Sequence, residues 1–366
     1  MEQVDVAVVG AGVVGLALAA RLSRDGRSLA LLESHPRHGV ETSSRNSEVV
    51  HAGLYYPPGT LKNRLCHEGR RMLYALAPEA GVFVKRTGKL IVAAESSELP
   101  ALAELCRRAE EAGAEGLEAL DGAGARAKVP GLRAAGALWS PETGIVDSEE
   151  LMLHFRRRAE EQGAFLLFSS PLTAAERSGA SYELTFGPSG EKVRARFVVN
   201  AGGLHADKVA ALPGLDAEAA GYRLRWCKGS YFRSRRDLGI AHLVYPLPER
   251  HGLGVHLTLD RRGGARFGPD IEFVETLDYE VDEAKRERFA EAARRYLPGI
   301  GPDDLVPDTS GIRPKLAAPD SGSADFIINE ESARGLPGWV NLVGIESPGL
   351  TASPAIAEHV ASLLGL

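Results

Sequence analysis

The sequence has few cysteines and no surplus of positive charge. Its three cysteines, Cys66, Cys106 and Cys227, are odd in number and far apart. They therefore predict neither a disulfide framework nor a metal site, and they fit a reducing compartment. The net charge of −6 at pH 7 argues against a nucleic-acid-binding protein, which would carry a basic face.

The sequence also has no long hydrophobic run. None approaches the ~18 residues of a transmembrane helix, and the first five residues have no basic region typical of a signal peptide. We therefore expect a cytoplasmic protein, with at most a peripheral contact at the inner face of a membrane. The composition is that of a globular protein, and 366 residues suffice for one large or two moderate domains.

Glycine, by contrast, is abundant, and near the N-terminus its spacing forms a motif. Residues 4–33 predict a buried strand, a glycine turn, a helix, a second buried strand and an acid. Gly10 permits the tight turn, Gly12 lets the backbone approach a pyrophosphate, and Gly15 lets the helix pack closely on the sheet. We interpret this unit as a dinucleotide site. The alternative is a glycine turn that binds nothing.

The helix and the acid complete this predicted site. The helix begins near Val13 and Val14, where free N–H groups and the positive end of the helix dipole favour phosphate. Glu33 closes the second strand and can accept hydrogen bonds from both ribose hydroxyls. Its charge would repel a 2′-phosphate, which argues against NADP.

Two later glycine turns indicate a longer ligand than NAD. One follows a predicted strand at Asn200-Ala201-Gly202-Gly203, and the other runs from Gly344 to Thr351 into a final helix. A helix N-terminus under a flavin ring would stabilise the negative charge that develops on reduction. The sequence therefore predicts FAD, held from both ends. The predicted cofactor contacts outside the first motif are Ser43, Ser44, Arg45, Asn46, Leu172, Asn200, Ala201, Gly202, Arg313, Gly344, Pro348, Gly349, Leu350 and Thr351.

The strand and helix pattern predicts an α/β protein with an inserted α+β domain. Helices are expected at 61–76 and 98–112, and another, capped by Asp147 or Ser148, is expected to end near residue 161. Residues 182–186 and 192–199 predict a hairpin. Long antiparallel strands are expected at 222–233, 241–245, 252–259 and 265–268.

Several segments spread over nearly the whole chain resemble a known family. They include Val50-His51-Ala52-Gly53-Leu54-Tyr55-Tyr56, Lys228-Gly229-Ser230-Tyr231-Phe232, Gly311-Ile312-Arg313-Pro314-Lys315 and Ile345-Glu346-Ser347-Pro348-Gly349. In these the chain resembles FAD-dependent oxidoreductases of the D-amino-acid-oxidase (DAO) fold, most of all the L-2-hydroxyglutarate dehydrogenase/oxidase group.

The resemblance implies non-covalent FAD and oxidation of a 2-hydroxy acid, foremost L-2-hydroxyglutarate, to the 2-oxo acid. It also implies a Rossmann-like FAD-binding domain of the glutathione-reductase-like variant and a mixed antiparallel-sheet substrate domain. We expect the FAD-binding domain at 1–78, 145–218 and 310–366, and the substrate-binding domain at 79–144 and 219–309.

The reaction needs a hydride acceptor, a base and partners for the substrate carboxylates. FAD accepts the hydride, and a histidine has a pKa suited to the base. His51 is the first candidate for the base and His256 the second, and either could instead be structural. Carboxylates call for cations, for which Arg313, Lys228 and Lys315 are candidates. Arg313 is assigned to catalysis and could also contact the flavin. The predicted substrate-binding residues are Tyr55, Tyr56, Lys228, Tyr231, Tyr245 and Lys315.

Three alternatives remain open at this stage. The first is a D-amino-acid, glycine or sarcosine-type amine oxidase on the same fold. The second is a glycerol-3-phosphate dehydrogenase-like enzyme, which should have a basic phosphate-binding cluster. The third is a carrier that binds FAD without catalysis. The expected partners are a small 2-hydroxy or amino acid and an electron acceptor such as a quinone or oxygen.

Overall fold

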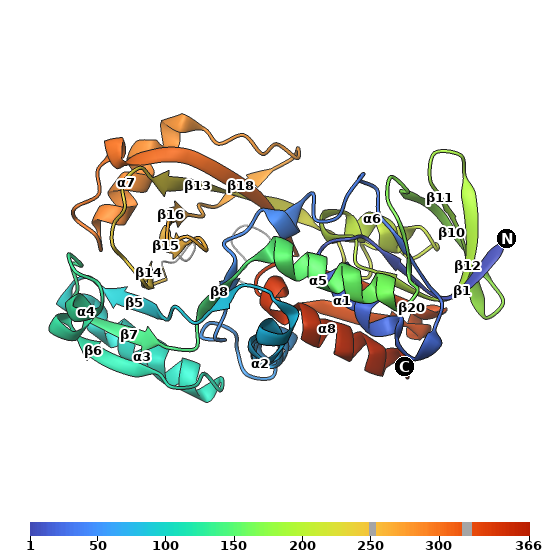
Figure 1. Ribbon diagram of the computed structural model, residues 1–366, viewed down its shortest axis with the longest axis horizontal. Coiled ribbons are helices and arrows are strands. Elements are labelled where there is room, and N and C mark those ends of the chain that lie inside the picture. The colour runs from blue at the N-terminus through green and yellow to red at the C-terminus, as the bar shows by residue number, and fades with distance from the viewer. Residues whose placement is uncertain (249–253, 317–323) are drawn as a thin grey trace.

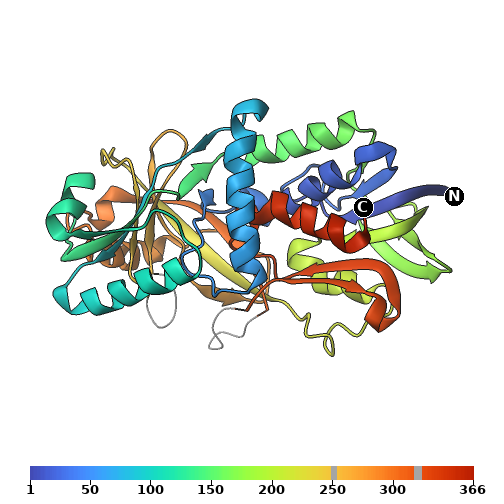
Figure 2. The same cartoon turned by 90° about the horizontal axis from the view of Figure 1, so that it is seen from below.

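The computed structural model describes residues 1–248, 254–316 and 324–366. Two large sheets lie side by side along the long axis of the molecule, and helix α2 crosses between them (Figures 1 and 2). Both chain ends lie at the first sheet (Figure 1). Among the described residues, no helix is both long and apolar enough to span a bilayer.

The first sheet has the strand order β10-β11-β12-β1-β2-β9, and β20 lies beside β12 and carries β19. Its strands are β1 (Glu2–Val9), β2 (Leu29–Leu32), β9 (Phe165–Leu167), β10 (Leu172–Ser178), β11 (Ser181–Phe186), β12 (Glu191–Asn200), β19 (Ile327–Glu331) and β20 (Leu336–Val343).

The second sheet has the order β17-β13-β16-β15-β14-β5-β7-β6, and β18 also pairs with β13. Its strands are β5 (Lys89–Ala93), β6 (Glu118–Asp121), β7 (Gly136–Ser140), β13 (Arg225–Ser234), β14 (Leu243–Pro246), β15 (His256–Leu259), β16 (Ala265–Gly268), β17 (Glu272–Val274) and β18 (Leu305–Lys315). A small third sheet contains β3 (Val49–Val50), β8 (Gly144–Val146) and β4 (Val84–Lys85).

Eight α-helices accompany these sheets in the described part of the chain. They are α1 (Val13–Leu22), α2 (Leu61–Ala80), α3 (Leu99–Glu111), α4 (Gly122–Lys128), α5 (Ser148–Glu161), α6 (Ala206–Ala211), α7 (Arg286–Arg294) and α8 (Gly349–Leu364).

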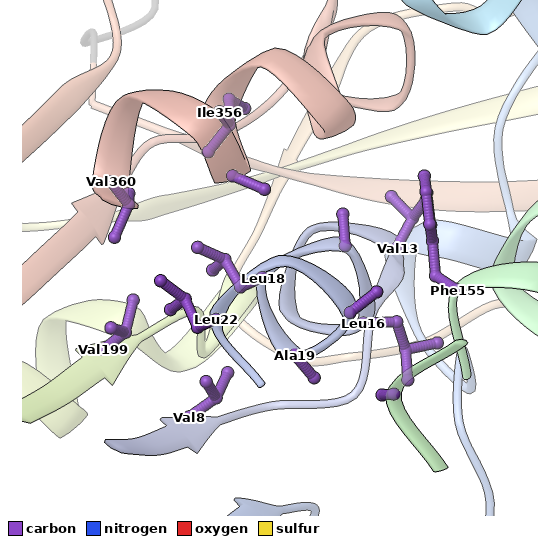
Figure 3. Packing of buried hydrophobic residues seen from close by; sticks show 14 of the residues in the cluster. Val8, Val13, Leu16, Leu18, Ala19, Leu22, Phe155, Val199, Ile356 and Val360 are labelled. Carbon is purple, nitrogen blue, oxygen red and sulfur yellow. The ribbon is translucent and has the colours of Figure 1, made fainter. Parts of the chain in front are cut away.

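The core of the first half surrounds α1. Parallel pairing places β1 between β12 and β2, and α1 packs against α5 and α8. Leu16, Leu18 and Leu22 of α1 are fully buried (Figure 3), and each such side chain contributes roughly 1.5–3 kcal/mol of transfer free energy. This packing fixes the N-terminus of α1 at the carboxyl ends of β1 and β12, the edge at which ligands bind in α/β sheets.

Helix α2 fixes the start of α8. The Thr60 hydroxyl caps α2 by accepting a hydrogen bond from the Asn63 N–H, and Gly81 ends the helix in the left-handed region with φ of 66°. At Gly69 a Cβ atom would lie 2.2 Å from the carbonyl oxygen of Thr351. Because Gly69 has no side chain, α2 can press against the first turn of α8, which borders the cavity described below.

The predicted fold class is confirmed, and the βαβ unit, α5 with its Asp147 cap and the hairpin of β11 and β12 all form. The predicted strand 222–233 begins only at Arg225, because Tyr222 is fully buried and its hydroxyl binds Glu331. The predicted strand 252–259 starts in the described residues at His256, and residues 252 and 253 lie outside them.

Other expectations about strands were incomplete. Strand β14 pairs antiparallel with β15, as expected, but its other neighbour, β5, runs parallel to it, and this pairing was not predicted. Strands β6 and β10 were not predicted. The second sheet draws on 89–140 and 225–315, so β18 crosses the expected boundary at residue 310. The division into two domains stays a prediction.

Candidate active site

A cavity lies between the carboxyl edge of the first sheet and strands β13 and β18 of the second. It comprises about 1110 Å³ of space between the protein atoms when the solvent in its open mouth is included. Its walls come from the turn after β1, residues 42–51, the turn after β12, strands β13 and β18, and residues 345–350. Of the predicted cofactor contacts, those that line it are Gly12, Val13, Val14, Gly15, Ser43, Arg45, Asn46, Ala201, Arg313, Pro348, Gly349 and Leu350.

The first glycine turn has no room for side chains. Gly10 has φ of +100°, and a Cβ atom on Gly15 would lie 1.9 Å from its carbonyl oxygen. A Cβ atom on Gly12 would lie 2.9 Å from the Ser43 hydroxyl, which accepts a hydrogen bond from the Val13 N–H at 2.9 Å. Ser43, one of the predicted cofactor contacts, therefore lies directly against this turn.

Glu33 lies behind this turn and is 7% exposed. Its carboxylate accepts hydrogen bonds from the Ala11 N–H at 2.6 Å and the His35 N–H at 2.8 Å. These bonds fix the carboxylate at the end of β2, beside the glycine turn, where an acceptor for ribose hydroxyls is required.

The other predicted cofactor residues support the cavity from behind. The Asn200 side chain donates to the Ala206 carbonyl and accepts from the Gly202 N–H, so it shapes the turn after β12. The Thr351 hydroxyl accepts from the His51 N–H at 3.0 Å and donates to the Val49 carbonyl, which joins α8 to β3. The remaining four, Gly10, Ser44, Leu172 and Gly344, are outside the cavity lining.

These features fit an adenine dinucleotide that extends to a second ring. The turn after β1 gives backbone N–H groups and no side-chain bulk for the pyrophosphate. At the far end of the same cavity, Pro348, Gly349 and Leu350 open α8, whose N-terminus can stabilise negative charge on a reduced flavin. The cavity is therefore suited to FAD.

His51 borders the cavity directly after β3. Its Nε2 lies 3.1 Å from the hydroxyl of Ser347, whose oxygen lies 3.3 Å from the Tyr56 hydroxyl. Burial and the nearby Lys89 ammonium lower the pKa of His51 to about 3. His51 is therefore a neutral imidazole at working pH, with a hydrogen-bonded route from its ring to Tyr56.

Arg313 and Tyr231 border the same cavity from β18 and β13. The Arg313 guanidinium donates to the backbone carbonyl oxygens of Asp270, at 2.9 Å, and of Cys227 and Lys228, both at 3.4 Å. No carboxylate among the described residues pairs with it. The Tyr231 hydroxyl lies 2.7 Å from that of Ser47. Nε and Nη2 of Arg313 are thus engaged by backbone carbonyls, and its Nη1 is the nitrogen that remains to donate to an anionic ligand.

Two of the predicted cations are already engaged. Lys228 pairs with Asp278 at 2.7 Å. Lys315 and Lys62 both pair with Glu346 at 3.1 Å. Burial alone would raise the pKa of Glu346, but these lysines, together with Arg313, hold it below the ordinary value.

The second candidate for the base, His256, lies outside the cavity lining. Its ring stacks on that of Tyr245 with centroids 3.5 Å apart, and both side chains are buried. Tyr55 is partly buried, and its buried hydroxyl has no hydrogen-bond partner. The structure thus brings His51, Arg313 and Tyr231 together in the cavity lining. Tyr56 lies outside the lining and contacts it through Ser347, and His256, Tyr245 and Tyr55 also lie outside it.

Sequence reasoning missed two residues of the cavity lining, Glu346 and Ser347, and one buried residue behind it, Lys89. Ser347 and Glu346 occur in a segment that carried the resemblance, but nothing local indicated that they bind His51 and two lysines. Lys89 opens β5 and is fully buried. A lysine before the apolar run Leu90-Ile91-Val92 was the available signal, and it reads equally well as a strand end exposed to solvent.

Comparison with known proteins agrees with this geometry. The model of the family described as FAD dependent oxidoreductase (DAO) matches residues 5–363, so the chain belongs to this family of enzymes and uses FAD as cofactor. The mitochondrial L-2-hydroxyglutarate dehydrogenase of Arabidopsis thaliana is 40% identical over 99% of this chain and 83% of its own length. That of Caenorhabditis elegans is 29% identical over 99% of this chain and 93% of its own.

A solved structure supports the fold independently. The L-α-glycerophosphate oxidase of Mycoplasma pneumoniae with FAD bound has a TM-score of 0.89, at 23% identity, over 100% of this chain and 96% of its own. The relatives from Arabidopsis and Caenorhabditis are named as mitochondrial, and the cytoplasmic location expected for this chain stays a prediction.

Proposed function

We propose that this enzyme oxidises L-2-hydroxyglutarate to 2-oxoglutarate. The observation that carries the proposal is a neutral His51, hydrogen-bonded to Ser347, in the same cavity lining as Arg313 of β18. A 2-hydroxy acid needs both a base for its hydroxyl proton and a cation for its carboxylate. The similarity to L-2-hydroxyglutarate dehydrogenases supports the same substrate.

The protein's part in the reaction is to bind the acid and accept a proton. Arg313 would hold the carboxylate next to the reacting carbon through the N–H donors of Nη1. His51 would accept the hydroxyl proton at Nε2, the nitrogen beside Ser347. FAD supplies the hydride acceptor when bound, and a quinone or oxygen would then take the electrons.

The low pKa of His51 suits this role once substrate is present. A carboxylate within about 4–6 Å of an imidazole favours its charged form, so an anionic substrate raises the basicity of His51 at the moment it is needed. In the free enzyme the imidazole is always in the form that accepts a proton.

The test is anaerobic reduction of the bound flavin by a panel of substrates. We expect L-2-hydroxyglutarate to bleach the flavin band, and glycine, sarcosine, D-amino acids and glycerol 3-phosphate to leave it unchanged. Bleaching by an amine alone would establish an amine oxidase, and bleaching by glycerol 3-phosphate alone a glycerol-3-phosphate dehydrogenase. Bound FAD that no compound reduces would indicate a carrier.

A further inference from the structure

Lys89 is a buried lysine without an anion. Its side chain is 0% exposed, and Nζ has no hydrogen-bond partner. Lysine is almost never fully buried unless it is paired, and an unsatisfied buried donor in a native fold requires an explanation. Burial lowers the pKa of Lys89 to about 7.

Two tyrosines enclose the Lys89 amine. Nζ lies 4.6 Å from the ring centre of Tyr245 and 4.9 Å from that of Tyr55. Strand pairing explains the first contact, because β14 runs beside β5 with Leu243 opposite Lys89. The Tyr55 hydroxyl is itself buried without a partner, so two unsatisfied donors lie in one cluster.

This cluster adjoins the cavity wall. The Lys89 charge lowers the pKa of His51, which lines the cavity, and the Cys66 thiol also lies within electrostatic range of Lys89. Burial and the neighbouring phenols of Tyr55 and Tyr231 raise the pKa of Tyr245, and Tyr231 is another cavity residue. Lys89 and Tyr55 are not part of the cavity lining but lie behind it, and the Lys89 charge acts on the lining residue His51.

The other lysines near the cavity have carboxylate partners. Lys62 and Lys315 bind Glu346, and Lys228 binds Asp278. None of the described carboxylates pairs with Lys89. Arg313 can bind one carboxylate of a substrate, so Lys89 is available to bind a second carboxylate.

We propose that Lys89 Nζ and the Tyr55 hydroxyl bind the second carboxylate of the substrate and thereby select dicarboxylic over monocarboxylic 2-hydroxy acids. This inference rests on the proposed function and adds the specificity-determining residues. Since the two rings enclose Nζ, the Tyr55 side chain moves aside when the carboxylate enters, and its hydroxyl then donates to that carboxylate.

Two consequences follow for protons. A carboxylate favours the charged amine, so binding above pH 7 takes up one proton at Lys89. The carboxylate also neutralises the charge that lowers the pKa of His51. A dicarboxylic substrate therefore raises the basicity of His51 more than a monocarboxylic one.

The first experiment compares L-2-hydroxyglutarate with L-2-hydroxybutyrate in the holoenzyme. In Lys89→Met, we expect KM for the dicarboxylate to rise roughly 10- to 100-fold, the range for loss of a charge-assisted hydrogen bond, with KM for the monocarboxylate unchanged. Tyr55→Phe should shift the same ratio in the same direction by a smaller factor. Lys128→Met is the matched control, because the Lys128 amine lies 4.0 Å from the Trp139 ring on a helix outside the cavity lining.

The second experiment measures binding of 2-oxoglutarate to the oxidised holoenzyme through the change in flavin absorbance. We expect the wild-type Kd to rise about tenfold per pH unit above pH 7, and that of Lys89→Met to lack this dependence. If Lys89→Met yields no holoenzyme, the pH dependence of the wild-type Kd and the ratio of KM values in Tyr55→Phe still test the role of Lys89.

The outcomes separate this inference from the proposed function. Wild-type enzyme that oxidises L-2-hydroxyglutarate, with the same substrate ratio in Lys89→Met and wild type, overturns only the role of Lys89. A pH-independent Kd in the wild type overturns it as well. Wild-type enzyme that does not oxidise L-2-hydroxyglutarate at all overturns both.

Discussion

The imidazole of His51 and the hydroxyl of Ser347 lie 3.1 Å apart, although 296 residues separate them in the chain. The first follows β3 and the second precedes α8. The Thr351 hydroxyl, one turn into α8, accepts from the His51 N–H and so holds the two segments together. His51, the proposed base, is thus held to the first turn of α8, the helix whose N-terminus lines the cavity.

Replacing His51 with Asn should remove the base and leave the cofactor in place. We expect kcat for L-2-hydroxyglutarate to fall by about 10²–10⁴, the usual contribution of general base catalysis, while the FAD content of the purified protein stays unchanged. Stopped-flow measurement of anaerobic flavin reduction isolates this step. A Ser347→Ala variant, which keeps the imidazole and removes its partner, should lose less activity, and an equal loss in both variants would argue that the pair acts only structurally.

The pH dependence of flavin reduction should show no titration near pH 6.5. His51 has a pKa of about 3 in the free enzyme, so it is already neutral throughout the range from pH 5 to 8. We therefore expect kcat/KM for a monocarboxylic 2-hydroxy acid to be flat across that range. In Lys89→Met one cause of the lowered pKa is absent, so the pKa of His51 should rise. An acid limb centred near pH 6.5 in the wild type would contradict the neutral state of His51.

Placing a methyl group on Gly15 should release FAD. The added Cβ would lie 1.9 Å from the Gly10 carbonyl oxygen, so α1 must move away from the turn, at a destabilisation of about 1–3 kcal/mol. We expect Gly15→Ala to be purified with little FAD, measured as the ratio of flavin to protein absorbance. The control is Gly299→Ala, since the nearest atom to that Cβ is an Arg236 nitrogen at 4.0 Å. Full FAD content in Gly15→Ala would contradict the assigned site.

Local patterns predicted those parts of the fold whose causes are local. Gly12 and Gly15 are needed because of contacts with Ser43 and with the Gly10 carbonyl oxygen, and Gly10 is needed for its φ of +100°. The close approach of the Ala201 carbonyl oxygen to Gly10 is a distant contact, but the turn itself required glycine there, and the unit formed as expected. The predicted start of β13 was wrong because the Tyr222 hydroxyl is bound by Glu331, which lies 109 residues further on in the chain. No pattern within the segment contains that contact.

For the site, too, local patterns identified residues, whereas contacts with distant parts of the chain could not be predicted. Residues in distinctive segments, such as His51 and Arg313, could be proposed in advance, and both border the cavity. Whether a cation is free depends on partners that only folding supplies. Lys228 and Lys315 looked suitable in sequence and proved to be paired, whereas Lys89 was overlooked and has no such partner.

Arg313 and Lys89 should differ in which substrates they affect. If Arg313 holds the carboxylate common to all 2-hydroxy acids, Arg313→Lys should raise KM for L-2-hydroxyglutarate and L-2-hydroxybutyrate alike, by roughly 10-fold or more, because a lysine cannot reproduce the planar guanidinium. Steady-state kinetics with both substrates measures this. A rise confined to the dicarboxylate would exchange the roles of the two cations, and loss of FAD would assign Arg313 to the cofactor.

Lys89 should also reduce the stability of the enzyme, as expected for a residue retained for function. Its pKa is about 7 in the folded protein against 10.5 for an ordinary lysine, so the unfolded chain binds more protons between those values. The free energy of unfolding is therefore lowered fully below pH 7, and this deficit shrinks as the pH rises towards 10.5.

Because Lys89→Met removes a buried donor that has no partner, we expect it to be more stable than the wild type at pH 6–7 by about 1–3 kcal/mol. The difference should become smaller at pH 9. Thermal midpoints measured at one fixed excess of FAD keep the contribution of cofactor binding constant, and Lys128→Met provides the comparison for loss of a lysine stacked on a ring. A Lys89→Met enzyme that is less stable than the wild type at every pH would mean that this amine supports the fold, and the argument for a carboxylate partner would lose its energetic basis.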